Sequence, residues 1–204
     1  IRITALRPDP GFNDHGPPTT YYHLFTGQGW TAGLDITAVY KIKKTDIVLS
    51  YTLSKIQEKY DQVFHGDYFS PQEDRRHQLK LSGNYQFGPV MLGGLVTYKS
   101  KAPYVSFVRV EEHGGGGIDM TDPQSALQYL PEYFSLDLSA DYAFDFFKSK
   151  AQLGVSLINA TDHANIQEIQ HTGRVSRDNM GGLYITQQTE LLGRTWNAHV
   201  KLVF

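Results

Sequence analysis

The chain of 204 residues contains no cysteine, which excludes a disulfide-stabilised scaffold and a thiolate metal site. It also lacks a run of about 18 apolar residues, so no transmembrane helix is expected. The formal net charge is -2, without the excess of basic residues that nucleic-acid-binding proteins show, so no nucleic-acid partner is expected. Apolar residues at helical spacing are missing too, which leaves an all-β chain as the predicted class.

Strict alternation of apolar and polar residues is present instead, most clearly at the C-terminal end. Alternation with period two predicts a β-strand whose two faces meet different surroundings. From Trp196 onward the apolar row consists of Trp196, Ala198, Val200, Leu202 and Phe204. The polar row consists of Asn197, His199 and Lys201.

The same alternation recurs along the chain and predicts seven strands. Weak alternation at residues 1–7 leaves an eighth strand open, and residues 8–18, rich in proline and glycine, are predicted to be a loop. The seven predicted strands lie near residues 30–42, 47–54, 78–87, 90–99, 134–144, 151–157 and 196–204.

The connections between these strands alternate between short and long. Short turns are expected at residues 43–45, 88–89 and 145–150, and long loops at residues 55–74, 100–131 and 160–190. Strands of about ten residues joined in this way are typical of outer-membrane barrels, with short turns on the periplasmic side. Loops of this length are improbable in a soluble β-sandwich.

Charged and strongly polar side chains lie in the middle of the predicted strands, all on the face opposite the apolar one. Burial of unpaired charges in a dry core is costly, whereas a water-filled or plugged lumen tolerates them. We therefore expect two sets of side chains on opposite faces, lipid-facing Leu34, Leu81, Leu136 and Trp196 and lumen-facing Asp35, Lys80 and Asp137.

Six segments in sequence order resemble the closing strands of the barrel of TonB-dependent outer-membrane receptors. The most specific is Leu130–Ser139, a loop that ends in Leu-Pro-x-Tyr before a strand with Leu-Asp. The resemblance covers residues 29–204, and the six segments are Gly29–Asp35, Leu49–Lys55, Asp74–Leu79, Leu130–Ser139, Leu157–Asp162 and Gly193–Phe204.

The resemblance implies an antiparallel transmembrane β-barrel of roughly 22 strands around a plug, of which this chain supplies about seven or eight. Residues 1–204 are then the C-terminal portion of the barrel, with the plug domain and the TonB box absent from this chain. The start at Ile1 without a signal peptide suits a trimmed protein or a fragment. Two alternatives stay open, a complete eight-stranded barrel with a structural or adhesive role and a soluble β-sandwich binding module.

The function implied by the resemblance is TonB-dependent active uptake of a scarce ligand across the bacterial outer membrane. An iron–siderophore is the first choice, followed by cobalamin, a carbohydrate or a peptide. The implied partners are the TonB–ExbB–ExbD energising complex acting through the missing plug, outer-membrane lipid and lipopolysaccharide, and the barrel-assembly machinery. The aromatic C-terminal residue Phe204 resembles the signal that this machinery reads. No enzymatic activity and no cofactor are expected.

Residues of the predicted long loops are candidates for ligand contacts. Aromatic side chains often line binding pockets, and arginine presents a fork that suits anionic groups. The aromatic residues can equally form an interfacial girdle, and the arginines an ion-paired entry to a strand. The candidates are Tyr60, Phe64, Tyr68, Arg75, Arg76 and Tyr104.

The predicted loop at residues 100–131 holds acidic residues and a histidine, which are cation ligands in other proteins, although a solvated loop is the favoured interpretation. No nucleophile elbow or catalytic triad spacing is found, so no catalytic, cofactor-binding or metal-binding residue is predicted. The residues of this loop are Glu111, Glu112, His113, Asp119 and Asp122.

Overall fold

The computed structural model describes residues 2–11, 19–61, 64–105, 127–147, 149–174 and 183–203. Within these ranges the regular structure consists of β-strands and one turn of 3-10 helix, η1 (Phe64–Gly66). No helix in the described ranges is long and apolar enough to span a membrane. The prediction of an all-β chain is confirmed.

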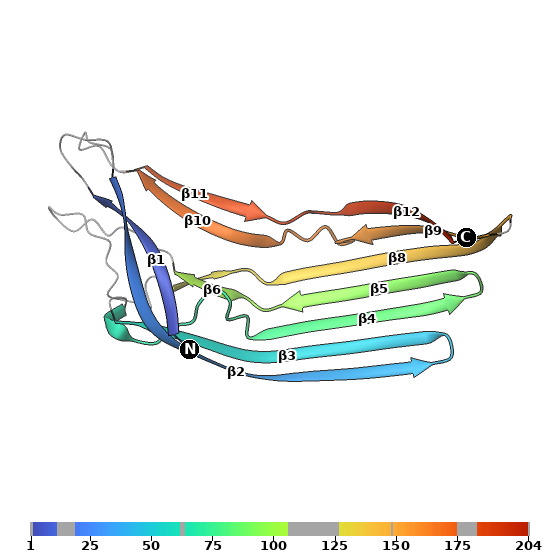
Figure 1. The fold of residues 1–204 in the computed structure, drawn as a ribbon, viewed down its shortest axis with the longest axis horizontal. Helices are drawn as coiled ribbons and strands as arrows, with labels where there is room; N and C mark the ends of the chain where they lie inside the picture. The colour runs from blue at the N-terminus through green and yellow to red at the C-terminus, as the bar shows by residue number, and fades with distance from the viewer. Residues whose placement is uncertain are drawn as a thin grey trace. The chain divides into compact units, whose positions relative to one another are not determined.

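Eight strands form one sheet in the hydrogen-bonded order β1-β2-β3-β4-β5-β8-β9-β12 (Figure 1). Neighbours with a resolved register run antiparallel, as predicted. The strands are β1 (Arg2–Gly11), β2 (Thr19–Ile42), β3 (Thr45–Tyr60), β4 (His77–Phe87), β5 (Val90–Lys99), β8 (Tyr133–Phe146), β9 (Ser149–Ile158) and β12 (Thr195–Val203).

Two further pairs of strands lie outside this sheet, β6 (Ala102–Val105) with β7 (Leu127–Leu130), and β10 (Ile166–Arg174) with β11 (Leu183–Glu190). In the main sheet, β1 and β12 end the order and do not pair with each other within the described residues. The described sheet is therefore open.

The chain divides into two compact units, which are described separately. The first comprises residues 1–32, 55–74 and 103–128, and the second comprises residues 33–54, 75–102 and 129–204. In the second unit the turns β2–β3, β4–β5 and β8–β9 lie at one end of the sheet (Figure 1). Each contains a residue with left-handed backbone, at Lys43, Gly88 and Phe147, as tight hairpin turns require.

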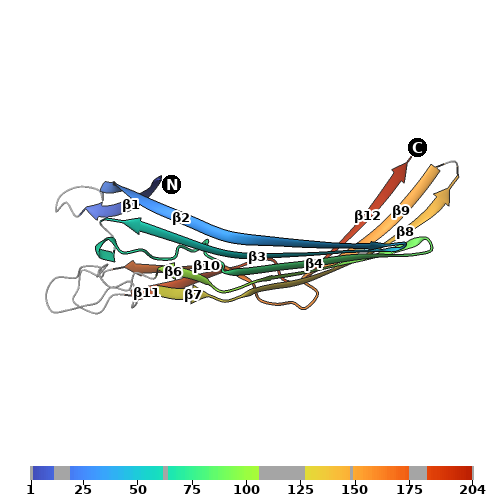
Figure 2. The same ribbon diagram turned by 90° about the horizontal axis from the view of Figure 1, so that it is seen from below.

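Strand registers in the second unit confirm the predicted separation of the two faces. Leu81, Val96 and Leu136 are partners across three neighbouring strands and form one apolar row. The apolar pairing continues over the next two strands, because Leu157 of β9 pairs with Leu138 of β8 and with Trp196 of β12. Figure 2 shows the strand directions turning from β3 and β4 toward β12, the twist expected of an open sheet.

The opposite face of the second unit carries the polar rows. Lys80 pairs with Thr97, and Asp137 pairs with Leu95. Each of these positions is next to an apolar-row residue in its strand, so its side chain points to the other face. On the first strand of this unit, Asp35 accepts a hydrogen bond of 2.5 Å from the Thr52 hydroxyl, which places both on the same face. The predicted opposition of apolar and polar residues is thus present in the sheet.

The apolar face of the second unit is exposed rather than packed. Leu34 is 56% exposed, Leu81 41% and Trp196 67%. Across both units the buried apolar side chains of the described residues are few, namely Tyr60, Phe64, Ala102, Leu130, Ala151 and Ile166. No apolar core underlies this face in the part of the chain that the structure describes.

The predicted loop at residues 8–18 is wrong at its start, because β1 continues through Pro8 and Pro10 to Gly11. These prolines pair with Tyr22 and Thr20 of β2. Proline lacks the donor that a central strand needs, but an edge strand tolerates it.

The three predicted long loops also contain strand structure that the sequence pattern did not predict. β3 extends to Tyr60, β6 and β7 lie within residues 100–131, and the β10–β11 hairpin lies within residues 160–190. A two-stranded ladder is held by backbone hydrogen bonds and can form without alternating apolar residues, the signal on which the prediction depended.

Candidate functional site

Three aromatic rings form a small core at the end of β3 in the first unit. The ring of Phe69 lies 5.0 Å from that of Phe64, edge to face, and 6.0 Å from that of Tyr60. Tyr60 and Phe64 are buried, so these two candidates for ligand contact chiefly stabilise the segment that follows β3.

Gly27 of β2 allows the Tyr60 ring to lie close to the backbone. A Cβ atom at Gly27 would collide with the carbonyl oxygen of Lys59 and lie 2.5 Å from Cδ1 of Tyr60. Only glycine fits at this point of contact between the two strands, a known use of glycine in β-sheets.

The Tyr60 hydroxyl donates a hydrogen bond of 3.1 Å to Oε2 of Glu58. Burial, the charge and hydrogen bond of Glu58, and the charge of Glu73 raise the pKa of Tyr60 to about 12. The phenol is therefore neutral at physiological pH and acts as a donor.

Tyr68 is the most exposed of the aromatic candidates, with 48% of its surface accessible. The Nζ atom of Lys59 lies 5.9 Å from the centroid of its ring, a cation–π contact. Tyr104, in β6, is half-buried. Among the four aromatic candidates, Tyr68 offers the largest accessible ring.

The two arginine candidates belong to the second unit, at the entry to β4. Nη1 of Arg75 donates a hydrogen bond of 2.8 Å to the carbonyl oxygen of Ser100, which fixes the guanidinium beside the end of β5. Burial lowers the pKa of Arg75, although a guanidinium remains charged at neutral pH. The backbone of Arg76 accepts a hydrogen bond of 3.0 Å from the Ser54 amide, which continues the pairing with β3.

The six candidates therefore do not form one site within a single unit. Tyr60, Phe64, Tyr68 and Tyr104 lie in the first unit, and Arg75 and Arg76 lie in the second.

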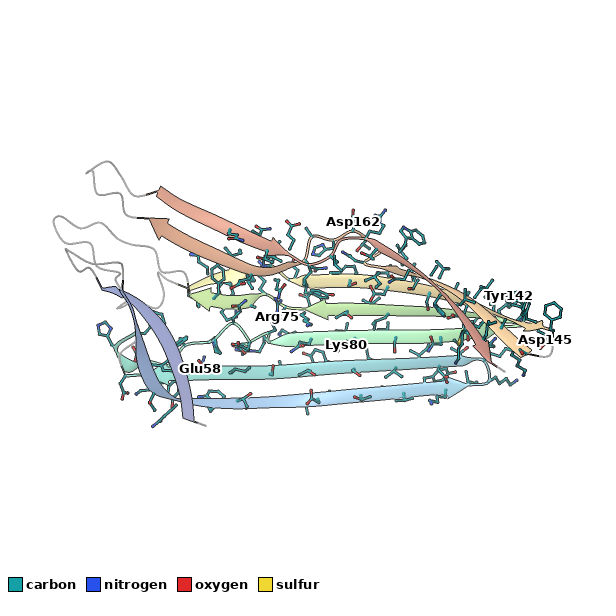
Figure 3. All side chains as sticks on the ribbon, turned by 45° about the horizontal axis from the view of Figure 1, so that its top comes forward. Glu58, Arg75, Lys80, Tyr142, Asp145 and Asp162 are labelled. Atoms are coloured by element: carbon teal, nitrogen blue, oxygen red, sulfur yellow. The ribbon has the colours of Figure 1, made fainter. Side chains whose placement is uncertain are left out.

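A hydrogen-bonded turn follows β9 in the second unit, at the predicted strand exit. Asn159 and Asp162 have left-handed backbone conformations, with φ of 50° and 57°. The Asn159 side chain accepts from the amide of His163 at 3.1 Å and donates to its carbonyl at 2.9 Å. Asp162, labelled in Figure 3, accepts from the amide of Arg194 at 2.8 Å and ties the turn to the segment before β12.

Asn165 was not singled out from the sequence, yet it is buried and holds the start of β8. Its side chain accepts from the amide of Phe134 at 2.9 Å and donates to the carbonyl of Phe134 at 2.8 Å. The side-chain amide thus imitates a strand partner. The sequence signal that could have identified Asn165 is its position three residues after Asp162, the last residue of the Asn-x-x-Asp motif at the exit from β9.

A histidine and an aspartate meet on the polar face above a glycine. Nε2 of His199 lies 3.1 Å from Oδ1 of Asp141, and both residues are register partners of Gly154 on β9. A Cβ atom at Gly154 would collide with both side chains. The missing side chain therefore makes this pair across three strands possible.

The possible cation loop with Glu111 and His113, and the terminal Phe204, lie outside the described residues. Among the described residues, no group of three or more histidine, aspartate or glutamate side chains is arranged to hold a metal ion.

In comparisons with known proteins, no family model, no curated protein and no solved structure matches the chain.

Proposed function

We propose that this chain forms part of the barrel wall of a TonB-dependent outer-membrane receptor and serves the energised uptake of a scarce ligand. The observation that carries the proposal is the sheet of the second unit, with large exposed apolar side chains in registered rows on one face and charged side chains on the other. A contiguous apolar surface of this kind marks a lipid or protein contact.

Lipid is the better occupant of this face because of the regular alternation and the position of the aromatic side chains. Near the β8–β9 turn, the Tyr142 ring stacks on that of Phe144 at 5.7 Å, and Phe146 contacts Phe147 at 4.8 Å (Tyr142 in Figure 3). Aromatic side chains at strand ends are typical of the interfacial girdle of an outer-membrane barrel. The short turns would then lie on the periplasmic side.

Assignment to the receptor family depends on the motifs, two of which are in contact. Oδ1 of Asp137, within the Leu130–Ser139 motif, accepts hydrogen bonds from the Asn159 amide at 2.9 Å and from the Ser135 hydroxyl at 2.6 Å. Asn159 begins the exit turn of the Leu157–Asp162 motif. The two motifs are therefore hydrogen-bonded to each other, close to the point where β8 begins and β9 ends.

In the proposed receptor, the remaining strands, the plug and the TonB box belong to segments other than residues 1–204. The TonB–ExbB–ExbD complex would act through that plug, and the ligand would be an iron–siderophore or another scarce nutrient. Outer-membrane lipid and lipopolysaccharide would surround the apolar face, and barrel-assembly machinery would insert the strands.

Quenching of tryptophan fluorescence by brominated lipid tests the membrane part of the proposal. The chain has two tryptophans, so a Trp30→Phe variant reports on Trp196 alone. In vesicles we expect strong quenching of Trp196 by lipid brominated on the acyl chain. A monomeric chain that is soluble without detergent and whose Trp196 is not quenched would contradict the proposal.

Uptake is tested separately in the source bacterium. Deletion of the gene should abolish uptake of the labelled ligand under scarcity, and loss of TonB should have the same effect. Uptake that persists without TonB would argue against the receptor assignment even if lipid contact were established.

A complete eight-stranded barrel with a structural or adhesive role is the second candidate, favoured by the eight strands of the sheet order. This candidate requires β1 to pair with β12. Cysteines introduced on these two strands should then form a disulfide in vesicles, whereas the receptor proposal expects none.

A further inference from the structure

Three cationic side chains gather around the entry to β4 and the end of β5 in the second unit. Lys80 pairs with Thr97 and Gln78 pairs with Lys99, so Lys80 and Lys99 are diagonal neighbours on the polar face. Arg75 precedes β4, and Figure 3 shows it close to the start of the strand that carries Lys80.

The positions of Arg75 and Lys99 are fixed by contacts that leave their charges uncompensated. The hydrogen bond of Arg75 to the Ser100 carbonyl uses one of five guanidinium donors. The ammonium of Lys99 lies 5.3 Å from the centroid of the Tyr133 ring, its register partner on β8. Both side chains are half-buried, whereas Lys80 is exposed.

Two charges of the same sign lie close to Lys99, that of Lys80, its diagonal neighbour in the register, and that of Arg75, which is bonded to Ser100. Within the described residues none of the three cations forms an ion pair, and Asp137, on the neighbouring strand β8, is already bonded to Ser135 and Asn159. Three neighbouring cations that form no ion pair repel one another, and a bound anion would relieve that repulsion.

We propose that Arg75, Lys80 and Lys99 bind an oxyanion group, a phosphate or a carboxylate, of a small ligand that reaches the polar face. Arginine offers a planar fork, the two lysines offer point charges, and Gln78 and Thr97 are the cross-strand partners of Lys99 and Lys80. The inference rests on the proposed function in that the polar face is the path of the ligand.

Isothermal titration of the folded chain in neutral detergent with inorganic phosphate and with citrate tests the site. We expect saturable binding of at least one anion, weakened by added salt. A Lys80→Met/Lys99→Met double variant should lose affinity about ten-fold or more, which corresponds to about 1.4 kcal/mol or more. Binding of phosphate alone or citrate alone would identify which group the site prefers.

Lys201→Met is the matched control, because it removes a lysine from the polar face of β12, away from the cluster. The control should bind anions as the parent chain does, and circular dichroism should show that both variants are folded. No binding of either anion, or an equal loss in Lys201→Met, would overturn the inference.

Quenching of Trp196 by brominated lipid in the same samples separates the two proposals. Quenching without anion binding refutes the site and leaves the membrane role. Anion binding to a chain whose Trp196 is not quenched refutes the membrane role and with it the assumption that the site lies on a ligand path.

Discussion

At the scale of single residues, Gly154 controls how His199 and Asp141 meet. A Gly154→Ala substitution places a methyl group against both side chains and should lower the free energy of unfolding by about 1–3 kcal/mol. Urea unfolding in detergent measures the effect. Gly83→Ala is the control, because its Cβ would find its nearest neighbours at 3.9 Å, and a loss of equal size there would contradict this explanation.

Tyr60 gives a prediction about pH. Its pKa is raised in the folded state, so the stability contributed by the neutral phenol is fully present below pH about 10, the ordinary tyrosine value. That contribution should be lost as the pH rises from about 10 through about 12. An ultraviolet titration should lose one high-pH phenolate transition in Tyr60→Phe, and an unchanged titration would place the late transition on another tyrosine.

At the scale of elements, the segment that follows β9 holds β8 through side chains. Asn165→Ala removes both hydrogen bonds to Phe134 and leaves a strand amide and carbonyl without their partner. We expect a loss of about 2 kcal/mol or more in unfolding free energy. Hydrogen exchange of the Phe134 amide should accelerate.

Thr161→Ala tests whether that loss is specific to Asn165. Thr161 is exposed and makes one weak hydrogen bond of 3.5 Å to Asn159. Its substitution should change stability by less than about 0.5 kcal/mol. An effect as large as that of Asn165→Ala would mean that the whole turn, rather than the Asn165 pairing, limits stability.

Strands with alternating faces could be predicted from the sequence, and those without could not. The alternation from Trp196 and from Phe134 predicted β12 and β8 because each residue type matches its face. A strand at residues 1–7 was left undecided, and its continuation was missed because Pro8 and Pro10 are typical of a loop. Only the pairing with β2 shows that β1 continues to Gly11.

Prediction of the candidate site was weaker, because loop residues carry no periodic signal. Tyr60 and Phe64 were chosen as loop aromatics that could contact a ligand, and the structure buries both against Phe69. The cluster of Lys80 and Lys99 depends on the register of β4 and β5, since the two lysines are far apart in sequence.

At the scale of the whole molecule, an added charge should be costly on the apolar face of the sheet and should cost little on the polar face. Leu153 and Gln152 are neighbours on β9 with opposite orientations, and Leu153 is 46% exposed. Leu153→Lys should cost about 2–4 kcal/mol in a bilayer, and Gln152→Lys should cost little. Reversible unfolding from vesicles measures both. Equal small effects would show that the Leu153 face does not meet lipid.

The directions of the strands in the second unit limit how many strands a closed barrel that contained them could have. Seven strands of the sheet order pass through this unit, and consecutive neighbours run in opposite directions, so its two outermost strands, β2 and β12, both run toward the short turns. Joining them directly would create a parallel seam. A ring with antiparallel neighbours throughout needs an even number of strands, so a closed ring that contained these seven strands would have to add an odd number. A barrel of eight strands and one of about 22 both satisfy that condition.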